Sequence, residues 1–311
     1  MKRLWPVALL ACLIGCGKEP DVHPLRVFHA AGLTPVLEAV REDCRADLGI
    51  ELLAEGSGSQ VACRKVSELG RECDLVMVAD AGLIGQLLAN DCSWRLDFAS
   101  DEVVLGVGIR APNADLAERD WPAALLEPGV RLGRVDENQG PIGYRALLVW
   151  KLRELQGMPG LYDQLLAQTV MVVDDVSRLT PLLRSGELDY GFVYRSICIA
   201  QDVRSIELDP NINLGSPDVD YAAATVTYRK LKAGKPEDVV VHGALVTWAL
   251  SIPDEGAHEA LARQFVDYLL RRKADVLDAN GFRPIRPARF YGPSGRLGDF
   301  GGFAEHAGDL Q

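Results

Sequence analysis

Two patterns of apolar and polar positions alternate along the chain and predict its secondary structure. Short apolar runs, such as LRVFHA at 25–30 and DLVMVAD at 74–80, are typical of buried strands. The segments 33–48 and 144–155 place apolar residues at steps of three and four, which is the spacing of an amphipathic helix. Because strands and helices alternate with short connections, the chain is predicted to be an α/β protein with a mainly parallel sheet.

The same alternation continues through the second half of the chain. Strands are predicted at 98–108, 130–135, 170–175, 188–194 and 244–253, and helices at 161–168, 177–186 and 258–281. Residues 291–311 are rich in Gly and lack a clear period, so we expect a flexible C-terminal tail there.

Two of the predicted helices begin with residues suited to capping. Thr34 precedes Pro35 at one helix start, and Ser59 opens the helix that follows the strand IELLAEG at 50–56. Hydroxyl oxygens at these positions accept hydrogen bonds from the free N–H groups of a first helical turn. We therefore expect Thr34 and Ser59 to act as N-caps.

The helix that contains residues 144–155 begins differently, without a capping side chain. Gly140, Pro141 and Gly143 lie just before its apolar positions. Small residues there leave the first backbone N–H groups uncovered, and such groups bind anions. The alternative is an ordinary loop, because Pro opens many helices and Gly fills many loops.

Length and charge narrow the class of protein. A chain of 311 residues with 48% hydrophobic and 25% charged residues fits a soluble globular protein with two lobes. The formal net charge of −11 and the lack of a basic stripe exclude nucleic acid as the partner.

The N-terminus has the pattern of an export signal. Lys2 and Arg3 precede an apolar stretch from Trp5 to Ile14, which is too short to span a bilayer. The stretch ends in LIGC at 13–16, which resembles the lipobox of bacterial lipoproteins. This resemblance implies a signal peptide at 1–15, a lipidated Cys16 and a linker at 16–24. The alternative is an ordinary secretory signal with a chance cysteine.

The remaining cysteines and the histidines carry less information. Cys44, Cys63, Cys73 and Cys92 fall in the first third of the chain and Cys198 stands apart. In an exported protein we expect one or two disulfides among them, with the pairing left open. No CxxC pair or Cys/His cluster has metal-ligand spacing, and the five histidines are scattered. No metal or cofactor is expected.

Several phrases together resemble the substrate-binding proteins of molybdate/tungstate ABC importers, especially the tungstate-type branch. Their order and spacing cover about residues 25–289. The phrases are VFHAAGLTPVL (27–37), EGSGSQVACRKVSELGRECDLVMVAD (55–80), LIGQLL (83–88), PIGYRALL (141–148), GLYDQLL (160–166), SGELDYGFVYRS (185–196), IELDPNINLG (206–215) and ANGFRPIRPA (279–288).

The resemblance implies a type II periplasmic-binding-protein fold, in which two α/β lobes joined by two crossover strands close on an oxyanion. The implied first lobe is 22–105 plus 243–290, and the implied second lobe is 106–242. By position, the implied ligand-binding residues are Ala31, Gly32, Ser57, Ser59, Pro141, Ile142, Gly143 and Tyr194.

The sequence departs from this family at three positions. Gly32 replaces a serine, which should remove a donor and enlarge the pocket. Gly140 and Val193 replace two carboxylates that join the metal centre in the tungstate-type branch. Asp136 and Glu137 lie nearby but are expected to cover a solvated loop. Any bound molybdate or tungstate is therefore expected to stay tetrahedral.

The resemblance and the N-terminal pattern predict a monomeric, extracytoplasmic, lipid-anchored protein that delivers molybdate or tungstate to an ABC permease. The alternative is an orphan sensor or structural lipoprotein on the same scaffold, binding a different anion or none. An enzyme is not expected, because no GxSxG, HExxH, P-loop or GxGxxG motif occurs. His29 is expected to be structural, and Arg64, Lys65 and Arg145 to form ion pairs on the lobe surfaces.

Overall fold

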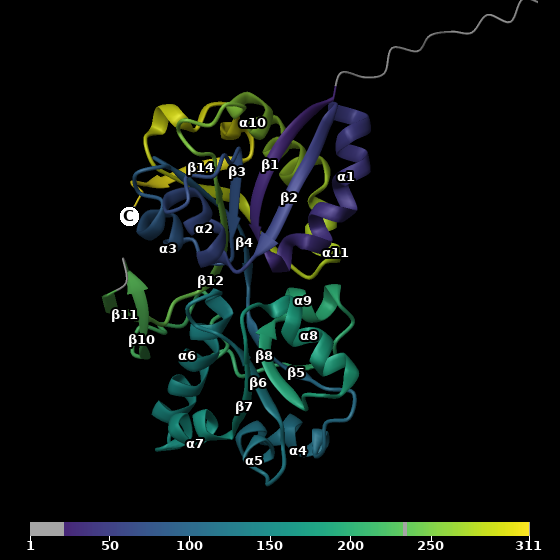
Figure 1. Cartoon of the computed structure of the whole chain (residues 1–311), viewed down its shortest axis with the longest axis vertical. Helices are drawn as coiled ribbons and strands as arrows, with labels where there is room; N and C mark the ends of the chain where they lie inside the picture. Colours follow the sequence, from purple (N-terminus) through teal and green to yellow (C-terminus); the bar gives the residue numbers. More distant parts are fainter. Residues whose placement is uncertain (1–21, 233–234, 311) are drawn as a thin grey trace, which may run out of the picture.

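Two β-sheets, one above the other in Figure 1, form the framework of the protein. The computed structural model describes residues 22–232 and 235–310. The larger sheet has seven strands in the order β14-β13-β4-β12-β3-β1-β2, and the smaller has five in the order β7-β6-β8-β5-β9. We call the seven-stranded sheet with its helices the first lobe, and the five-stranded sheet with its helices the second lobe. A hairpin of β10 and β11 stands beside them.

The strands and helices have the following bounds. The strands are β1 (His23–Ala30), β2 (Ile50–Ser57), β3 (Leu75–Val78), β4 (Arg95–Asp101), β5 (Val103–Val107), β6 (Leu132–Val135), β7 (Thr169–Val173), β8 (Tyr190–Tyr194), β9 (Ser205–Ile206), β10 (Thr225–Lys232), β11 (Lys235–His242), β12 (Val246–Ser251), β13 (Arg283–Tyr291) and β14 (Ala304–Gly308). The α-helices are α1 (Thr34–Leu48), α2 (Ser59–Ser67), α3 (Gly82–Leu87), α4 (Ala114–Arg119), α5 (Trp121–Leu125), α6 (Pro141–Leu155), α7 (Leu161–Gln168), α8 (Val176–Ser185), α9 (Arg195–Ala200), α10 (Glu259–Asp267) and α11 (Ala274–Ala279). Short helical turns are η1 (Ala31–Leu33), η2 (Tyr268–Arg272), η3 (Ser294–Arg296) and η4 (Gly298–Gly302).

The strands β3, β4 and β12 of the first lobe are buried on both faces of the sheet, as their apolar runs predict. β1 pairs in parallel with β2 and β3, while β12 pairs antiparallel with β3 and β4. Leu25 and Val27 share one apolar cluster with the inner face of α1, and Phe28 belongs to a second cluster with α2 and α3. Strand residues alternate between faces, so helices on both sides are needed to cover them.

The chain crosses between the lobes twice. Glu102 separates β4 of the first lobe from β5 of the second. The chain returns before β12, where the N–H of Val246 donates to the carbonyl of Leu214 at 2.8 Å. The two α/β lobes and their two crossovers confirm the expected fold class. The sheets are mixed and not mainly parallel as predicted, because β4 pairs antiparallel with β12 and β13, and β5 pairs antiparallel with β8 and β9. The second lobe also begins with β5 at Val103, before the implied boundary at 105. Among the described residues, no helix is both long and apolar enough to cross a membrane.

The expected loose tail is wrong for the described part of residues 291–311. β14 joins the edge of the large sheet by pairing in parallel with β13. Phe300 is fully buried and contacts Trp94, with 5.7 Å between ring centroids. The glycines suggested disorder, but burial of the aromatic side chains among them holds this segment on the first lobe.

Disulfides were also expected, and this expectation is wrong for the five described cysteines. Cys44, Cys63, Cys73, Cys92 and Cys198 are all free and buried. Cys63, Cys73 and Cys92 pack in the apolar cluster beneath α2 and α3. Burial disfavours the thiolate and raises the pKa of Cys92 to about 12, so these thiols behave as small apolar side chains.

A buried carboxylate lies where the chain first leaves the large sheet. Asp101 ends β4 and accepts hydrogen bonds from the N–H and hydroxyl of Ser196 and from the N–H of Glu102. Burial raises the pKa of Asp101 from its ordinary value of 3.8 to about 6, although these hydrogen bonds favour the charged form. Burial likewise raises the pKa of Asp97 in the same strand to about 6.

Stability is therefore expected to rise as pH falls from 7.5 toward 5. Between pH 6 and 3.8, Asp97 and Asp101 each hold a proton in the folded protein, whereas the same carboxyl groups in the unfolded chain have released theirs. Lowering the pH through this range therefore favours folding. His29 opposes this trend, because burial lowers its pKa below the ordinary 6.5. Urea unfolding at several pH values checks the expectation. Asp101→Asn should flatten the profile between pH 5 and 7, and a variant with the wild-type slope would contradict the role of Asp101.

Candidate functional site

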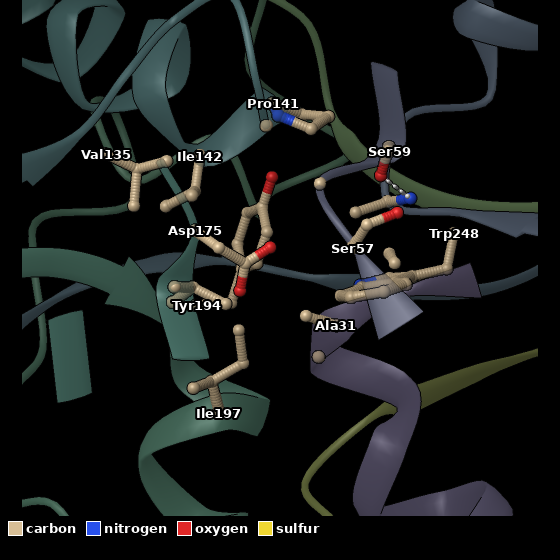
Figure 2. Close-up of a pocket in the computed structure, with 16 residues that line it drawn as sticks. Ala31, Ser57, Ser59, Val135, Pro141, Ile142, Asp175, Tyr194, Ile197 and Trp248 are labelled. Carbon is tan, nitrogen blue, oxygen red and sulfur yellow. Dashed lines mark hydrogen bonds between the residues drawn. The ribbon is translucent and has the colours of Figure 1, made fainter. Parts of the chain in front are cut away.

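A cavity lies between the lobes, and its wall combines segments far apart in sequence (Figure 2). The first lobe contributes small residues from η1 and from the start of α2, together with Trp248 of β12. The second lobe contributes the starts of α6 and α8 and two residues near the start of α9. The sixteen lining residues are Ala30, Ala31, Gly32, Ser57, Gly58, Ser59, Ala79, Val135, Gly140, Pro141, Ile142, Asp175, Val176, Tyr194, Ile197 and Trp248.

Three helices of eight or more residues begin at this cavity. α2 begins at Ser59, α6 at Pro141 and α8 at Val176, and all three residues line the wall. The first N–H groups of a helix have no partner within it, and the helix dipole makes this end positive. The N-cap residues of α2 and α6 are Gly58 and Gly140, which have no side chain to occupy those groups. The arrangement is suited to an anion.

Three hydroxyl groups in the wall are available as donors. The oxygen of each already accepts a hydrogen bond from another group of the protein: Ser57 from Lys65 Nζ, Ser59 from the N–H of Ala79 and Tyr194 from Arg145, all at 3.0 Å. With an oxygen lone pair already engaged, each hydroxyl is free to direct its proton into the cavity. Burial raises the pKa of Tyr194 above its ordinary value of 10, despite Arg145, so this hydroxyl keeps its proton.

The bond from Ala79 also corrects the predicted role of Ser59. The side chain of Ser59 makes no capping hydrogen bond in α2, and Gly58 is the N-cap. Thr34 likewise makes none, because it is the first residue of α1 and Leu33 is the N-cap. Both helix starts were predicted one residue too late, and the hydroxyl of Ser59 is therefore not used for capping.

The cations near the cavity lie behind its wall. None of the lining residues is Lys, Arg or His. Lys65 pairs with Glu55 at 2.9 Å, and Arg145 pairs with Asp80 at 3.2 Å. Lys65 and Arg145 are only 8% and 3% exposed, so the expectation that they pair on the lobe surfaces is wrong. His29 is buried, with Nδ1 2.9 Å from the carbonyl of Ala30, and burial lowers its pKa.

Seven of the eight predicted ligand-binding residues line this one cavity: Ala31, Gly32, Ser57, Ser59, Pro141, Ile142 and Tyr194. Gly143 does not line it. A Cβ at Gly143 would lie 2.6 Å from the backbone of Asp136 and Glu137, so this glycine allows the preceding loop to pack on α6. The roles of these eight predicted residues in ligand binding stay predictions.

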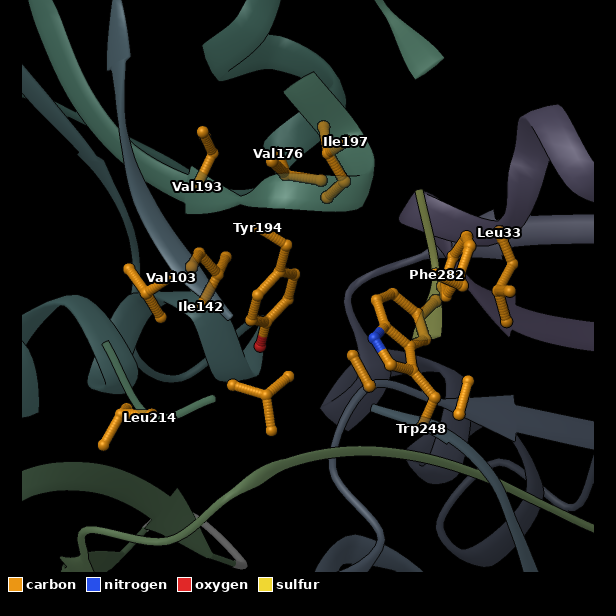
Figure 3. Close-up of a cluster of buried hydrophobic side chains, with 14 of the residues drawn as sticks. Leu33, Val103, Ile142, Val176, Val193, Tyr194, Ile197, Leu214, Trp248 and Phe282 are labelled. Atoms are coloured by element: carbon orange, nitrogen blue, oxygen red, sulfur yellow. The ribbon is translucent and has the colours of Figure 1, made fainter. Parts of the chain in front are cut away.

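Gly32 does not enlarge the pocket, contrary to expectation. A Cβ at this position would lie 2.9 Å from Trp248 and 3.1 Å from Ile197. Trp248 is fixed there by Phe282 and Tyr194, whose ring centroids lie 5.0 and 5.6 Å away (Figure 3). The space of the family's serine side chain is thus filled by an indole and an isoleucine. Nothing in the sequence near Trp248 indicated this, because its contacts are all distant along the chain.

The positions that replace family carboxylates differ from each other in the structure. Gly140 lines the cavity, whereas Val193 is fully buried in the apolar core. Asp136 and Glu137 do not line it either. Asp136 accepts a hydrogen bond from the N–H of Asn138 at 2.7 Å, and Glu137 pairs with Arg134. Within residues 22–232 and 235–310, no group of three or more His, Cys, Asp or Glu is placed to hold a metal ion.

Sequence reasoning missed one carboxylate that does line the cavity. Asp175 follows β7 and is the N-cap of α8, where its Oδ1 accepts a hydrogen bond from the N–H of Ser177 at 2.7 Å. A signal was present, because VMVVDD followed by a helix is a strand-to-helix junction like those at residues 30–34 and 57–59. Parallel strands bring such junctions to one edge of their sheets.

The lobes contact each other directly around the cavity. Gln60 of α2 donates to the carbonyl of Glu137 at 3.0 Å, and Arg64 donates to that of Asn138 at 3.2 Å. On the other side, Arg145 of α6 donates to the carbonyl of Ala79 at 2.7 Å, and the hydroxyl of Tyr144 donates to Asp80 at 2.5 Å. The backbone of Gly58 lies against that of Gln139. The two lobes are therefore closed on the cavity.

This geometry defines a two-lobed protein with a cavity between its lobes that is suited to a small anion and has no cation in its wall. A family model described as "Bacterial extracellular solute-binding protein" matches residues 25–283. The chain belongs to this family.

Named relatives and solved structures agree with that assignment. An uncharacterized solute-binding protein of Methanoculleus marisnigri is 29% identical over 299 residues, covering 86% of this chain and 83% of that protein. The molybdate/tungstate-binding protein WtpA of Pyrococcus abyssi is 28% identical and covers 87% and 89%. The fold is that of the Azotobacter vinelandii periplasmic molybdate-binding protein, with a TM-score of 0.62 at 19% identity and coverage of 83% and 98%.

Proposed function

We propose that this protein is an extracytoplasmic, lipid-anchored solute-binding protein that captures a tetrahedral oxyanion of the molybdate or tungstate type for an ABC permease. The observation that carries the proposal is the donor set of the cavity. The hydroxyls of Ser57, Ser59 and Tyr194 are each free to donate, and three helix N-termini surround the same space. Such donors match the several oxygens of an oxyanion.

The comparisons support the chemical class of the ligand. Relatives named as molybdate/tungstate-binding proteins cover most of this chain, and a relative of Haloferax volcanii is named as a putative ABC transporter molybdenum-binding protein. These named relatives are transport proteins, and we propose no catalytic role for this chain. We propose that it acts as a monomer, because one chain supplies both walls of the cavity.

Ser59→Ala is expected to weaken oxyanion binding with little loss of stability. The variant removes one hydrogen bond to a charged ligand, which is worth about 1.5–3 kcal/mol, or on the order of 10- to 100-fold in affinity. Because Ser59 does not cap α2, the change in unfolding free energy should stay near the ~1 kcal/mol of its bond with Ala79.

The measurement begins with a thermal-shift screen of the mature domain against molybdate, tungstate, sulfate, phosphate and chromate. An anion at 100 times its dissociation constant should stabilise the protein by about 2.7 kcal/mol. Calorimetric titration of wild type and Ser59→Ala with the best anion then gives the affinity ratio. If no oxyanion stabilises the wild type, the proposed function is wrong, and an unchanged affinity would remove Ser59 from the site.

We also propose that residues 1–15 are a signal peptide and that Cys16 is lipidated, followed by a linker. The expected end of this linker at residue 24 is wrong, because His23 and Pro24 belong to β1. Residues 1–21 lie outside the described part of the chain, so the proposal rests on the sequence alone. Cys16→Ser should move the protein from the membrane fraction to the soluble fraction. Mass spectrometry of the wild type should find acyl chains on Cys16. A Cys16→Ser variant that stays membrane-bound would contradict the anchor.

A further inference from the structure

The hairpin of β10 and β11 belongs to neither large sheet, yet it lies beside the junction of the two lobes and packs on α6 (Figure 1). Its base is fixed on the second crossover, where the N–H of Gly243 donates to the carbonyl of Ala224 at 2.9 Å. A Cβ at Gly243 would lie 2.2 Å from the carbonyl oxygen of Tyr221, so the segment before the hairpin packs directly against its base. The hydroxyl of Tyr221 in turn donates to the carbonyl of Pro210 at 2.6 Å. The crossover therefore holds the base of the hairpin in place.

One face of the hairpin covers the protein, and the other face is exposed. Val226 and Tyr228 of β10 are 3% and 8% exposed, whereas Thr227 and Arg229, which alternate with them, face solvent. The ring of Tyr228 stacks on that of Tyr144 in α6, with 6.1 Å between ring centroids and 2° between ring planes. Stacked rings bury apolar surface and attract each other, so the hairpin should move together with the second lobe.

Tyr228 also lies among polar groups of both lobes. Burial raises the pKa of Tyr228, a hydrogen bond with Gln60 and the charge of Arg64 oppose this rise, and the charges of Asp80 and Glu137 add to it. Gln60, Arg64 and Asp80 belong to the first lobe, whereas Glu137 belongs to the second. Tyr228 thus reaches from the second lobe to the groups through which the two lobes contact each other.

Two hydrogen bonds between the lobes lie beside Tyr228, where water has little access. Gln60, which donates to the carbonyl of Glu137, is 1% exposed. Tyr144, whose hydroxyl donates to Asp80, is 2% exposed and is covered by the ring of Tyr228. A hydrogen bond away from water is stronger than an exposed one, because the local dielectric constant is lower. Parting the lobes would break both bonds and separate Tyr228 from Gln60.

We propose that Tyr228 makes the hairpin of β10 and β11 a clamp that holds the lobes closed and so determines how long the protein retains its oxyanion. Tyr228 is stacked on Tyr144 of the second lobe and contacts Gln60 of the first, so the hairpin has to release α2 before the lobes can part. Tyr228 does not line the cavity, and it acts on the ligand only through closure, as a positioning residue. This inference rests on the proposed function and adds to it the element that controls release.

The test compares the rate of anion release from Tyr228→Ala and from wild type. Protein loaded with molybdate, tungstate, sulfate or phosphate is diluted rapidly, and release is followed by tryptophan fluorescence, because Trp248 lines the cavity. The dissociation rate of Tyr228→Ala should rise by on the order of 10-fold, since it loses the aromatic contact and exposes two hydrogen bonds to water. Tyr228→Phe keeps the stacked ring, so its rate should stay within about threefold of wild type.

Thr227→Ala is the matched control. Thr227 is the neighbouring residue of the same strand, but it is exposed on the opposite face of the hairpin, so its loss should leave the dissociation rate unchanged. Urea unfolding of each variant separates clamping from folding, because a purely structural role of Tyr228 would lower the free energy of unfolding without changing the dissociation rate. Tyr228→Leu fills part of the same space without a ring to stack, and it replaces Tyr228→Ala if that variant fails to fold.

Two results would overturn the inference while leaving the proposed function intact: release from Tyr228→Ala at the wild-type rate, and equal acceleration in Thr227→Ala. A wild type that binds none of the anions would instead overturn the proposed function. Small-angle X-ray scattering of the unloaded proteins then decides the inference by itself. Tyr228→Ala should be more expanded than wild type, and identical scattering would overturn the clamp as well.

Discussion

Replacing Gly58 by alanine is expected to abolish high-affinity binding while leaving the protein folded. A Cβ at Gly58 would lie 2.0 Å from the carbonyl oxygen of Gln139 in the opposite lobe, far below the 3.0 Å under which Cβ contacts essentially do not occur. The backbone of Gly58 (φ −59°, ψ 145°) suits any residue. Alanine is therefore unstrained in the first lobe itself and is excluded only by contact with the second.

Gly58→Ala should hinder closure of the two lobes. Keeping them apart would lose the hydrogen bonds from Gln60 to Glu137 and from Arg64 to Asn138, together with the ligand contacts of one wall. At about 1 kcal/mol for each neutral bond and more for those to the anion, the affinity should fall by on the order of 100-fold or more. The free energy of unfolding should change by less than about 1 kcal/mol.

Gly140→Ala is the control for this prediction. It adds the same methyl group on the facing side of the cavity, but its Cβ would lie 3.7 Å from Val135 and 3.9 Å from Gly58, which are ordinary contacts. Calorimetric titration and small-angle X-ray scattering of both variants with the oxyanion found by the screen check the expectation. A Gly58→Ala protein that binds and compacts like Gly140→Ala would show that the lobes need not approach this closely.

Replacing Arg145 by methionine is expected to cost both stability and binding. The guanidinium is 3% exposed and contacts both lobes: it donates to the carbonyl of Ala79 and the hydroxyl of Tyr194 and pairs with Asp80. Burial opposes its charge, yet Tyr194 and Asp80 hold the pKa of Arg145 above its ordinary value. Removing one partner of a buried pair leaves the other uncompensated, typically at a cost of about 3–5 kcal/mol.

Part of the free energy lost in Arg145→Met should appear as weaker closure of the lobes, because Ala79 and Asp80 belong to the first lobe and Arg145 to the second. A double-mutant cycle of Arg145→Met and Asp80→Asn, read by urea unfolding and by oxyanion titration, separates the two effects. The single Arg145→Met variant should lose affinity as well as unfolding free energy, and the double variant should recover part of both. If Arg145→Met destabilises the protein but binds normally once folded, Arg145 supports only the second lobe.

The local spacing of apolar residues was sufficient to predict most of the strands and helices. The apolar runs at 25–30 and 74–80 and the amphipathic segments at 33–48 and 144–155 correspond to β1, β3, α1 and α6. Each of these elements is recognised from the spacing of its own apolar residues, so no contact with distant residues is needed to predict it. The bare start of α6 at Gly140 and Pro141 was also readable, since small residues and Pro at a helix start need no knowledge of the rest of the fold.

The errors came where a residue's partner is distant in sequence. The tail at 291–311 looked unstructured, but Phe300 packs on Trp94 and β14 extends the large sheet. Arg145 looked like a surface cation, but the first lobe closes over it through Asp80. Composition and spacing contain no information about such contacts, because they form only when the two lobes are in place.

The sequence by itself determined that this chain alternates strands and helices, and that helices begin at glycine-rich loops which can hold an anion. Only the tertiary structure decided which groups line the cavity between the lobes. It turned Ser59 from a cap into a free donor, filled the space beside Gly32 with Trp248, set Gly58 against Gln139 and brought Asp175 into the wall. The physical reason is that helix starts follow from local backbone preferences, whereas donors, acceptors and volume in a cleft depend on side chains that the folded lobes bring together.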